Sequence, residues 1–376
     1  METVEKVGVK ARFKAYLKAL PKRWFITAFS GMAQGLFVTL IAGTILATFA
    51  DKVIGLDNYV GRTLSTIASM AKSLMGAGIG IGIAHSLGKN KLLVYASAVA
   101  GFVGAFADKL IVGVAPFTTL AFGAPGNPIG AYVVVMLAIE IVELYAGKTK
   151  LDIILIPLGV MALAFLGVYV AYPFIWAVNQ LGVLIALATK ATPFVMGVVI
   201  AVVMGVLLTM PTSSAAIWIS VAKSVVEGGG ANAEYMLIAG GAATVGCACH
   251  MVGFAVASFR ENKVSGLIAQ GVGTSMLQIP NVMKKPVIML PMILSSAVLG
   301  PLSTCLFEIK CGFNGGGMGT SGFVGIIDAF SYTTGTLGCI GIVLLMVILP
   351  ALLNWLISEF MRKKGWIQEG DMRLDV

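Results

Sequence analysis

Runs of about 20 apolar residues recur along almost the whole chain, and this repetition restricts the fold more than any other feature. The chain has 376 residues, of which 58% are hydrophobic and only 11% are charged. A helix needs about 20 mostly apolar residues to cross the hydrocarbon core of a bilayer. We therefore expect an all-α polytopic membrane protein with about ten transmembrane helices. The expected spans are 24–48, 64–87, 92–112, 128–145, 151–176, 193–210, 213–229, 234–259, 287–306 and 336–358.

Basic residues lie in short segments between the apolar runs, which explains the net charge of +9 without a nucleic-acid partner. Residues 1–23 are expected to form a basic amphipathic helix on the cytoplasmic leaflet of the lipid bilayer. Residues 24–360 then form the transmembrane domain, and residues 361–376 form a basic cytoplasmic tail. Both termini should be cytoplasmic, and the number of crossings even. The first apolar run is too long for a cleavable signal peptide.

A glycine-rich stretch at 314–322, with the sequence NGGGMGTSG, lies between two long apolar runs. It cannot form a stable transmembrane helix, so we expect irregular backbone at membrane depth, sheltered by protein or by a water-filled cavity. Segments 116–130 and 264–280 are similarly broken by Gly and Pro. The pattern Gly-x-Gly-Thr-Ser occurs at both 271–275 and 317–321. It is either a repeated way of lining a polar cavity or a coincidence in a Gly-rich chain.

Ionisable side chains inside the apolar runs are candidate site residues, because they are costly in lipid. His250 lies about ten residues before the basic residue Arg260, which places it roughly 15 Å deep. It is either a ring that binds a substrate hydroxyl or accepts its proton, or a neutral core histidine bonded to a neighbouring helix. Glu308 either points into the volume around the glycine-rich stretch or forms an interfacial pair with Lys310.

Uncharged polar residues around the broken segments complete the predicted substrate-binding set. They are Thr212, Ser213, Ser214, Gln270, Thr274, Ser275, Gln278, Asn281, Asn314, Thr320 and Ser321. Hydroxyls and amides with one His and one Glu suit a polyhydroxylated, weakly charged solute.

Several kinds of chemistry have no signal in the sequence. There is no Walker lysine motif and no Cys–His spacing typical of a metal site, so no metal and no cofactor is expected. The chain also has no soluble segment that could carry a phosphorylated Cys or His. Any phosphoryl transfer must therefore come from a partner protein.

Five segments together resemble the enzyme IIC membrane component of the sugar phosphotransferase system, and in particular its perfringolysin O regulator-like branch. They are PTSSAA at 211–216, AATVGCACHMVGFA at 242–255, SFREN at 258–262, GVGTSMLQIPN at 271–281 and GGMGTSG at 316–322.

The resemblance implies a homodimer of ten-helix subunits with re-entrant hairpins, located in the bacterial plasma membrane and working by alternating access. It also implies that a separate phosphorylated IIB protein phosphorylates the sugar on the cytoplasmic side. His250 and Glu308 are similar in type and setting to the His and Glu at the sugar in this family. The sequence around Glu308 lacks the Gly-Ile-Thr-Glu-Pro type of motif that marks the family's glutamate.

Three functions remain open from the sequence. The first is a sugar permease subunit, which the broken segments and the polar residues favour. The second is a membrane sensor that shares the fold and signals through a partner. The third is an ion-coupled transporter that would depend on Asp108, Glu140 and Glu143, although we interpret these three as structural residues near span ends.

Overall fold

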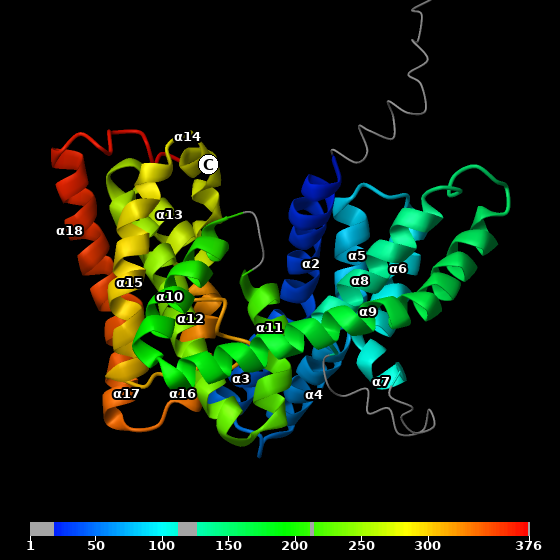
Figure 1. Ribbon diagram of the computed structural model, residues 1–376, viewed down its shortest axis with the longest axis horizontal. Helices are drawn as coiled ribbons and strands as arrows, with labels where there is room; N and C mark the ends of the chain where they lie inside the picture. Colours follow the sequence, from blue (N-terminus) through cyan, green and yellow to red (C-terminus); the bar gives the residue numbers. More distant parts are fainter. Residues whose placement is uncertain (1–18, 112–125, 211–213, 375–376) are drawn as a thin grey trace, which may run out of the picture.

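The computed structural model describes residues 19–111, 126–210 and 214–374, and every regular element in them is helical. A first group of helices runs from η1 to α8, a second from α10 to α18, and the long helix α9 joins the two (Figure 1). The first group comprises η1 Arg23–Ala28, α2 Phe29–Leu36, η2 Phe37–Ile41, α3 Ala42–Phe49, η3 Ala50–Ile54, α4 Tyr59–Ser73, α5 Met75–Ser86, α6 Lys91–Ala105, α7 Ala107–Ile111 and α8 Pro128–Val142. After α9 Asp152–Ala191 come α10 Pro193–Thr209, α11 Ser214–Gly228, α12 Gly230–Ala257, α13 Phe259–Ile268, η5 Ala269–Gly273, η6 Ser275–Gln278, α14 Ile279–Lys284, η7 Pro286–Met289, α15 Leu290–Cys305, η8 Ser321–Phe323, α16 Val324–Tyr332, α17 Thr336–Val343, η9 Leu344–Ile348 and α18 Leu349–Lys363.

Five continuous helical runs in the described residues are long and apolar enough to cross a bilayer. They are Ala19–Ala47, Asp152–Ala191, Gly230–Ala257, Pro286–Cys305 and Thr336–Lys363. The bent pair α4 and α5 adds a sixth if it counts as one span, and α6, α8 and α10 are shorter apolar helices. The prediction of an all-α polytopic membrane protein is confirmed. The count of ten crossings stays a prediction.

The predicted span 64–87 contains a break at Leu74, where α4 and α5 meet at an angle of 52°. The two halves pack on different neighbours, since α4 lies against α3 whereas α5 lies between α2 and α6. Glycines allow α2 and α5 to touch backbone to backbone: a Cβ at Gly31 would lie 2.3 Å from the carbonyl oxygen of Gly82. This close approach of small residues is typical of membrane helix packing.

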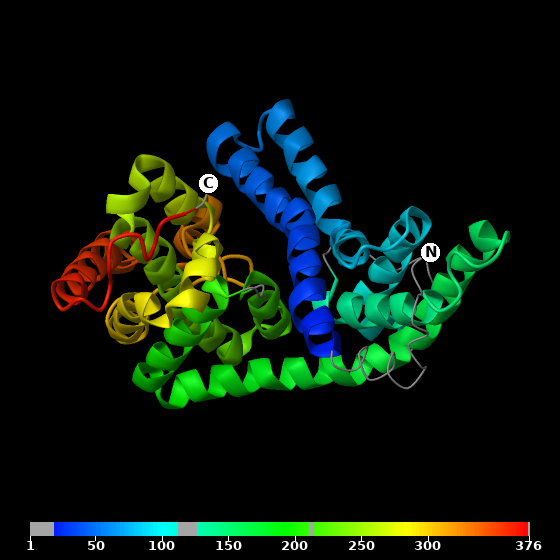
Figure 2. The same ribbon diagram turned by 90° about the horizontal axis from the view of Figure 1, so that it is seen from above.

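Helix α9 is much longer than the predicted span 151–176, because residues 179–189 continue the same helix. Its 40 residues extend about 60 Å, roughly twice the hydrocarbon thickness. It contacts α6 and α8 of the first group and α11 and α12 of the second. Figure 2 shows it running along one side of the molecule and connecting the two groups.

The start of the first helical run, Ala19–Ala47, lies at the same end of the molecule as α13, α14 and the C-terminal residues (Figure 1). Ion pairs also occur near the start of the first helical run. Arg23 contacts Glu140 at 2.9 Å, and Glu143 contacts both Arg23 and Lys89. These pairs agree with the interpretation of Glu140 and Glu143 as structural residues. Most of the predicted amphipathic segment 1–23 lies outside the described residues.

Candidate functional site

The glycine loop, residues 311–320 between α15 and α16, is irregular backbone enclosed by protein. The carboxylate of Asp328 accepts hydrogen bonds from the N–H groups of Gly312 at 2.8 Å and Gly315 at 3.0 Å. The hydroxyl of Ser214 donates to the carbonyl oxygen of Gly317 at 2.7 Å. Side chains thus satisfy main-chain groups that lipid would leave unpaired.

Asp328 on α16 was not identified from the sequence as a site residue. It is the one acidic residue within the apolar helix Val324–Tyr332. A carboxylate in such a helix needs donors nearby, and the neighbouring glycine-rich stretch offers free amide groups. The signal in the sequence was thus a lone Asp in an apolar run that follows a glycine-rich stretch.

The two copies of Gly-x-Gly-Thr-Ser lie against each other. The Thr320 hydroxyl donates to the carbonyl oxygen of Gly271 at 2.5 Å, and the Ser321 hydroxyl donates to that of Gly273 at 2.9 Å. The Thr-Ser pair of the second copy therefore holds the glycines of the first. The repeat places both broken segments at one point of the fold.

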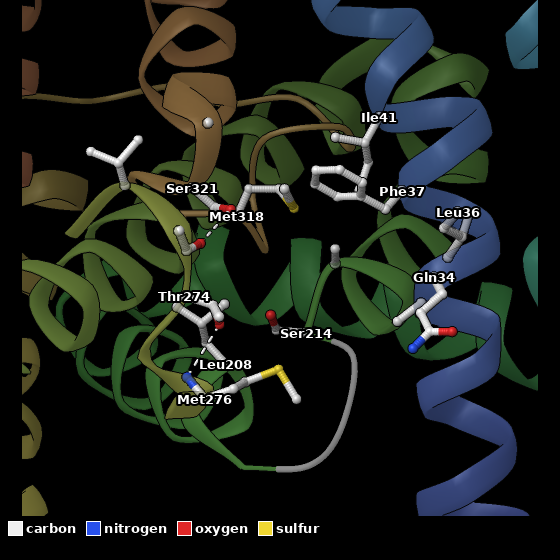
Figure 3. Close-up of a pocket in the computed structure, with 15 residues that line it drawn as sticks. Gln34, Leu36, Phe37, Ile41, Leu208, Ser214, Thr274, Met276, Met318 and Ser321 are labelled. Atoms are coloured by element: carbon white, nitrogen blue, oxygen red, sulfur yellow. Dashed lines mark hydrogen bonds between the residues drawn. The ribbon is translucent and has the colours of Figure 1, made fainter. Parts of the chain in front are cut away.

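A cavity of about 480 Å³ opens between the first helix group and these paired segments. Three predicted residues line it, namely Ser214, Thr274 and Ser321, and Figure 3 shows them opposite the helix that carries Gln34 and Phe37. The other lining residues are mostly apolar: Ala33, Leu36, Ile41, Leu208, Ala215, Val272, Gly273, Met276, Met318 and Gly322. Among the described residues, none that lines the cavity carries a charged side chain.

Gln34 on α2 is a cavity residue that the sequence analysis missed. Its side chain forms no hydrogen bond with any residue that the structure describes. The available signal was a lone amide in the first apolar run, where an unpaired polar group is costly. In the structure this amide is free to bind a solute.

His250 lies on α12, the helix at the centre of the second group, and its side chain is fully buried. Its Nδ1 is 2.9 Å from the Thr209 hydroxyl, which is 3.0 Å from the Ser275 hydroxyl. Its Nε2 has no hydrogen-bond partner among the described residues and lies against Gly205, where a Cβ would be 2.9 Å away. Hydroxyls therefore link His250 to Ser275, the neighbour of the cavity residue Thr274.

The structure does not bring Glu308 or Asn314 to this cavity. Glu308 is exposed with a left-handed backbone (φ 44°), and Lys310 pairs with Glu234 at 2.8 Å instead. The Oδ1 of Asn314 is buried without a hydrogen-bond partner among the described residues. Their roles in binding substrate stay predictions.

The predicted amide residues Gln270, Gln278 and Asn281 bond to protein groups, and Gln278 and Asn281 bond directly to the C-terminal tail. They do not line the cavity. Thr212 and Ser213 lie outside the described residues. Sugar contacts by all five stay predictions.

The described lining of the cavity offers hydrogen-bonding groups on largely apolar walls. Hydroxyls and one amide supply donors and acceptors, while apolar walls supply contact area, which is the usual composition of a small-molecule site. No three His, Cys, Asp or Glu side chains in the described residues are grouped to hold a metal ion. The fold is that of a multi-pass membrane protein, and the cavity has the size of a small-molecule site.

The chain matches the family described as "Phosphotransferase system, EIIC" over residues 26–374, and it belongs to that family. It is the membrane-embedded permease subunit of a sugar phosphotransferase system, and its partners are a sugar and a IIB protein. Comparison with curated proteins and with solved structures gives no match.

Proposed function

We propose that the sugar binds in the cavity between α2 and the paired glycine segments, in contact with Gln34, Ser214, Thr274 and Ser321. The observation that carries this proposal is the convergence of hydroxyls from three separate segments on one cavity that also receives a free amide. Its volume of about 480 Å³ lies within the usual range for small-molecule sites. The apolar side chains that line the cavity offer a surface for the C–H face of a sugar ring.

The other polar residues support this surface in the proposed mechanism. Thr320 holds Gly271, while His250 orients Thr209 and through it Ser275. A sugar hydroxyl that enters the cavity competes for the Ser321 hydroxyl, which in the structure donates to the carbonyl oxygen of Gly273. Because the cavity lies between the two helix groups, a change in their relative position would expose it alternately to each side.

The end of the molecule that carries α13, α14 and the C-terminal residues is proposed to face the cytoplasm of a bacterium. The basic residues Arg260, Lys263, Lys284 and Lys285 belong to this end, and positive charge favours the cytoplasmic side of the plasma membrane. Both termini would then be cytoplasmic. The separate phosphorylated IIB protein would reach the sugar from this end.

The resemblance to the perfringolysin O regulator-like branch supports two finer proposals, membership of that branch and a homodimeric assembly. The domain limits 24–360 and 361–376 remain part of the same proposal. Single-molecule mass measurement of the protein in nanodiscs tests the assembly. A mass equal to one subunit would refute the homodimer.

Protection of a single thiol by sugar tests the proposed site. Gln34→Cys is made in a background where Cys305 and Cys339 are replaced by Ser, because the other three cysteines are buried. Val38→Cys, one turn away and 70% exposed, is the matched control because it does not line the cavity. We expect the sugar that is taken up to slow maleimide labelling at position 34 but not at 38.

Two results would contradict the proposal. In the first, a transported sugar leaves labelling at position 34 unchanged. In the second, the wild type takes up no sugar from a broad panel in cells with the cognate IIB protein, which would remove the permease function itself.

A further inference from the structure

The C-terminal strap, residues 365–374, is not a free tail. It leaves α18 and runs across the second helix group to α14 (Figure 1). Ile367 is 2% exposed and Met372 is fully buried, and both pack in a cluster with Phe254 and Met292. The apolar anchors fix the strap at the proposed cytoplasmic end.

Polar contacts attach the strap to the segment from α13 to α14. Asn262 binds it twice: its Nδ2 donates to the carbonyl oxygen of Met372 at 2.8 Å, and its Oδ1 accepts from the N–H of Leu374 at 2.9 Å. Lys285 bonds the Asp371 carboxylate at 2.7 Å. Burial raises the pKa of Asp371, but the hydrogen bonds from Lys285 and from the N–H of Gln368, together with the positive charges of Lys285 and Arg362, outweigh it, so its pKa lies below the usual value.

Three amide side chains continue these contacts toward the cavity. Asn281 donates to the carbonyl oxygen of Arg373 at 2.8 Å and to the Oε1 of Gln278 at 2.9 Å. Gln278 donates to the carbonyl oxygen of Met372 and to the Oε1 of Gln270, both at 2.9 Å. Gln270 donates to the Ser258 hydroxyl at 2.9 Å.

The amide chain ends beside the wall of the cavity, next to its lining residues Val272 and Gly273. Gln270 belongs to η5, directly before Gly271 and close to Gly273, the two residues held by Thr320 and Ser321. Gln270 and Gln278 are fully buried, so an amide group that loses its partner would be stranded away from water. Displacement of the strap would remove one of the two acceptors of the Gln278 amide, and a rearrangement of η5 and η6 would restore its pairing.

We propose that the C-terminal strap is a positioning element for sugar binding, and that Gln270, Gln278 and Asn281 act through η5 and η6. The proposal rests on the proposed sugar site, because the strap would fix the wall that carries Thr274. A docked strap keeps the wall in its binding geometry. A displaced strap would leave the sugar with a poorly formed site.

Charge reversal of the Lys285–Asp371 pair tests the proposal. The variants are Lys285→Asp, Asp371→Lys and the double exchange, and the readouts are hydrogen exchange of residues 266–281 together with KM and kcat for uptake. We expect each single variant to speed hydrogen exchange in residues 266–281 and to raise KM about fivefold, with kcat within about twofold of the wild type. The double variant should restore the hydrogen-exchange rate and KM. The matched control is the charge-swapped variant of Arg260 and Glu359, which form a 2.8 Å ion pair that does not touch the strap. It should change neither readout.

Asp371→Ala and Asn281→Ala provide milder losses if a charge reversal prevents folding. The proposal would be overturned by variants in which the amides of the strap exchange hydrogen faster but those of residues 266–281 exchange at the wild-type rate. A KM that stays at the wild-type value in those variants would also overturn it. Hydrogen exchange is measured without sugar, so it tests the contact between the strap and residues 266–281 even if the wild type binds no sugar. Absence of sugar binding by the wild type would refute the proposed sugar site.

Discussion

The hydroxyl of Ser321 donates a 2.9 Å hydrogen bond to the carbonyl oxygen of Gly273, and both residues line the same cavity. This contact joins two segments that are 48 residues apart. It also places a hydroxyl donor where a solute can compete for it. The pair therefore combines a structural contact with a position in the proposed binding site.

Ser321→Ala should weaken sugar binding without unfolding the protein. A net hydrogen bond contributes about 0.5–1.5 kcal/mol, so we expect KM to rise by about two- to tenfold in uptake assays. Ser331→Ala is the matched control, because the Ser331 hydroxyl bonds only the carbonyl oxygen of Ile327 in its own helix. Equal KM values for the two variants would argue against a role for Ser321.

Thr209→Val should destabilise the protein, because it leaves Nδ1 of His250 and the hydroxyl of Ser275 without a buried partner. The expected loss is about 1–3 kcal/mol, seen as a lower thermal unfolding midpoint in detergent. Thr189→Val removes an equally buried hydroxyl that bonds only Ile185 of its own turn, and it should have a smaller effect. The link to His250 is disproved if both variants unfold at the same temperature.

Asp328→Ala should disorder the glycine loop, because it removes the acceptor for the N–H groups of Gly312 and Gly315. Each unpaired group costs about 1–3 kcal/mol. Asp328→Asn keeps an oxygen that can accept both bonds and should retain most of the stability. Thermal unfolding and uptake measure the difference, and identical behaviour of Ala and Asn would refute the role of the carboxylate as an acceptor.

Gly317→Ala should abolish uptake through steric conflict. The added Cβ would lie 2.5 Å from the carbonyl oxygen of Ser214, closer than real Cβ contacts allow. Gly228→Ala is the control, since nothing lies within 4 Å of its added Cβ. Normal uptake by Gly317→Ala would show that the loop has room to move away from Ser214.

The sequence predicted features that depend on local composition. Long apolar runs predicted membrane helices, and NGGGMGTSG at 314–322 predicted irregular backbone that protein must shelter. Ser214, Thr274 and Ser321 were predicted as substrate contacts and lie at the cavity. Their contact with sugar stays a prediction.

Features that depend on contacts between residues far apart in the chain could not be predicted from local composition. Nothing near Gln278 or Asn281 indicates that the amides bond a tail more than 90 residues away. At Leu74 the chain turns between α4 and α5, which pack against different helices. Hydropathy along the sequence does not show which helices will pack together. His250 fitted both a site and a core interpretation, because burial alone does not distinguish them.

The length of α9 makes the protein sensitive to the thickness of its membrane. An apolar helix of about 60 Å is twice as long as a hydrocarbon core about 30 Å thick, and we expect it to lie obliquely in the bilayer. A thicker lipid mixture would let α9 stand more upright, and both helix groups are attached to it. Acyl-chain length would then alter the spacing between the groups, and with it the room left for a sugar.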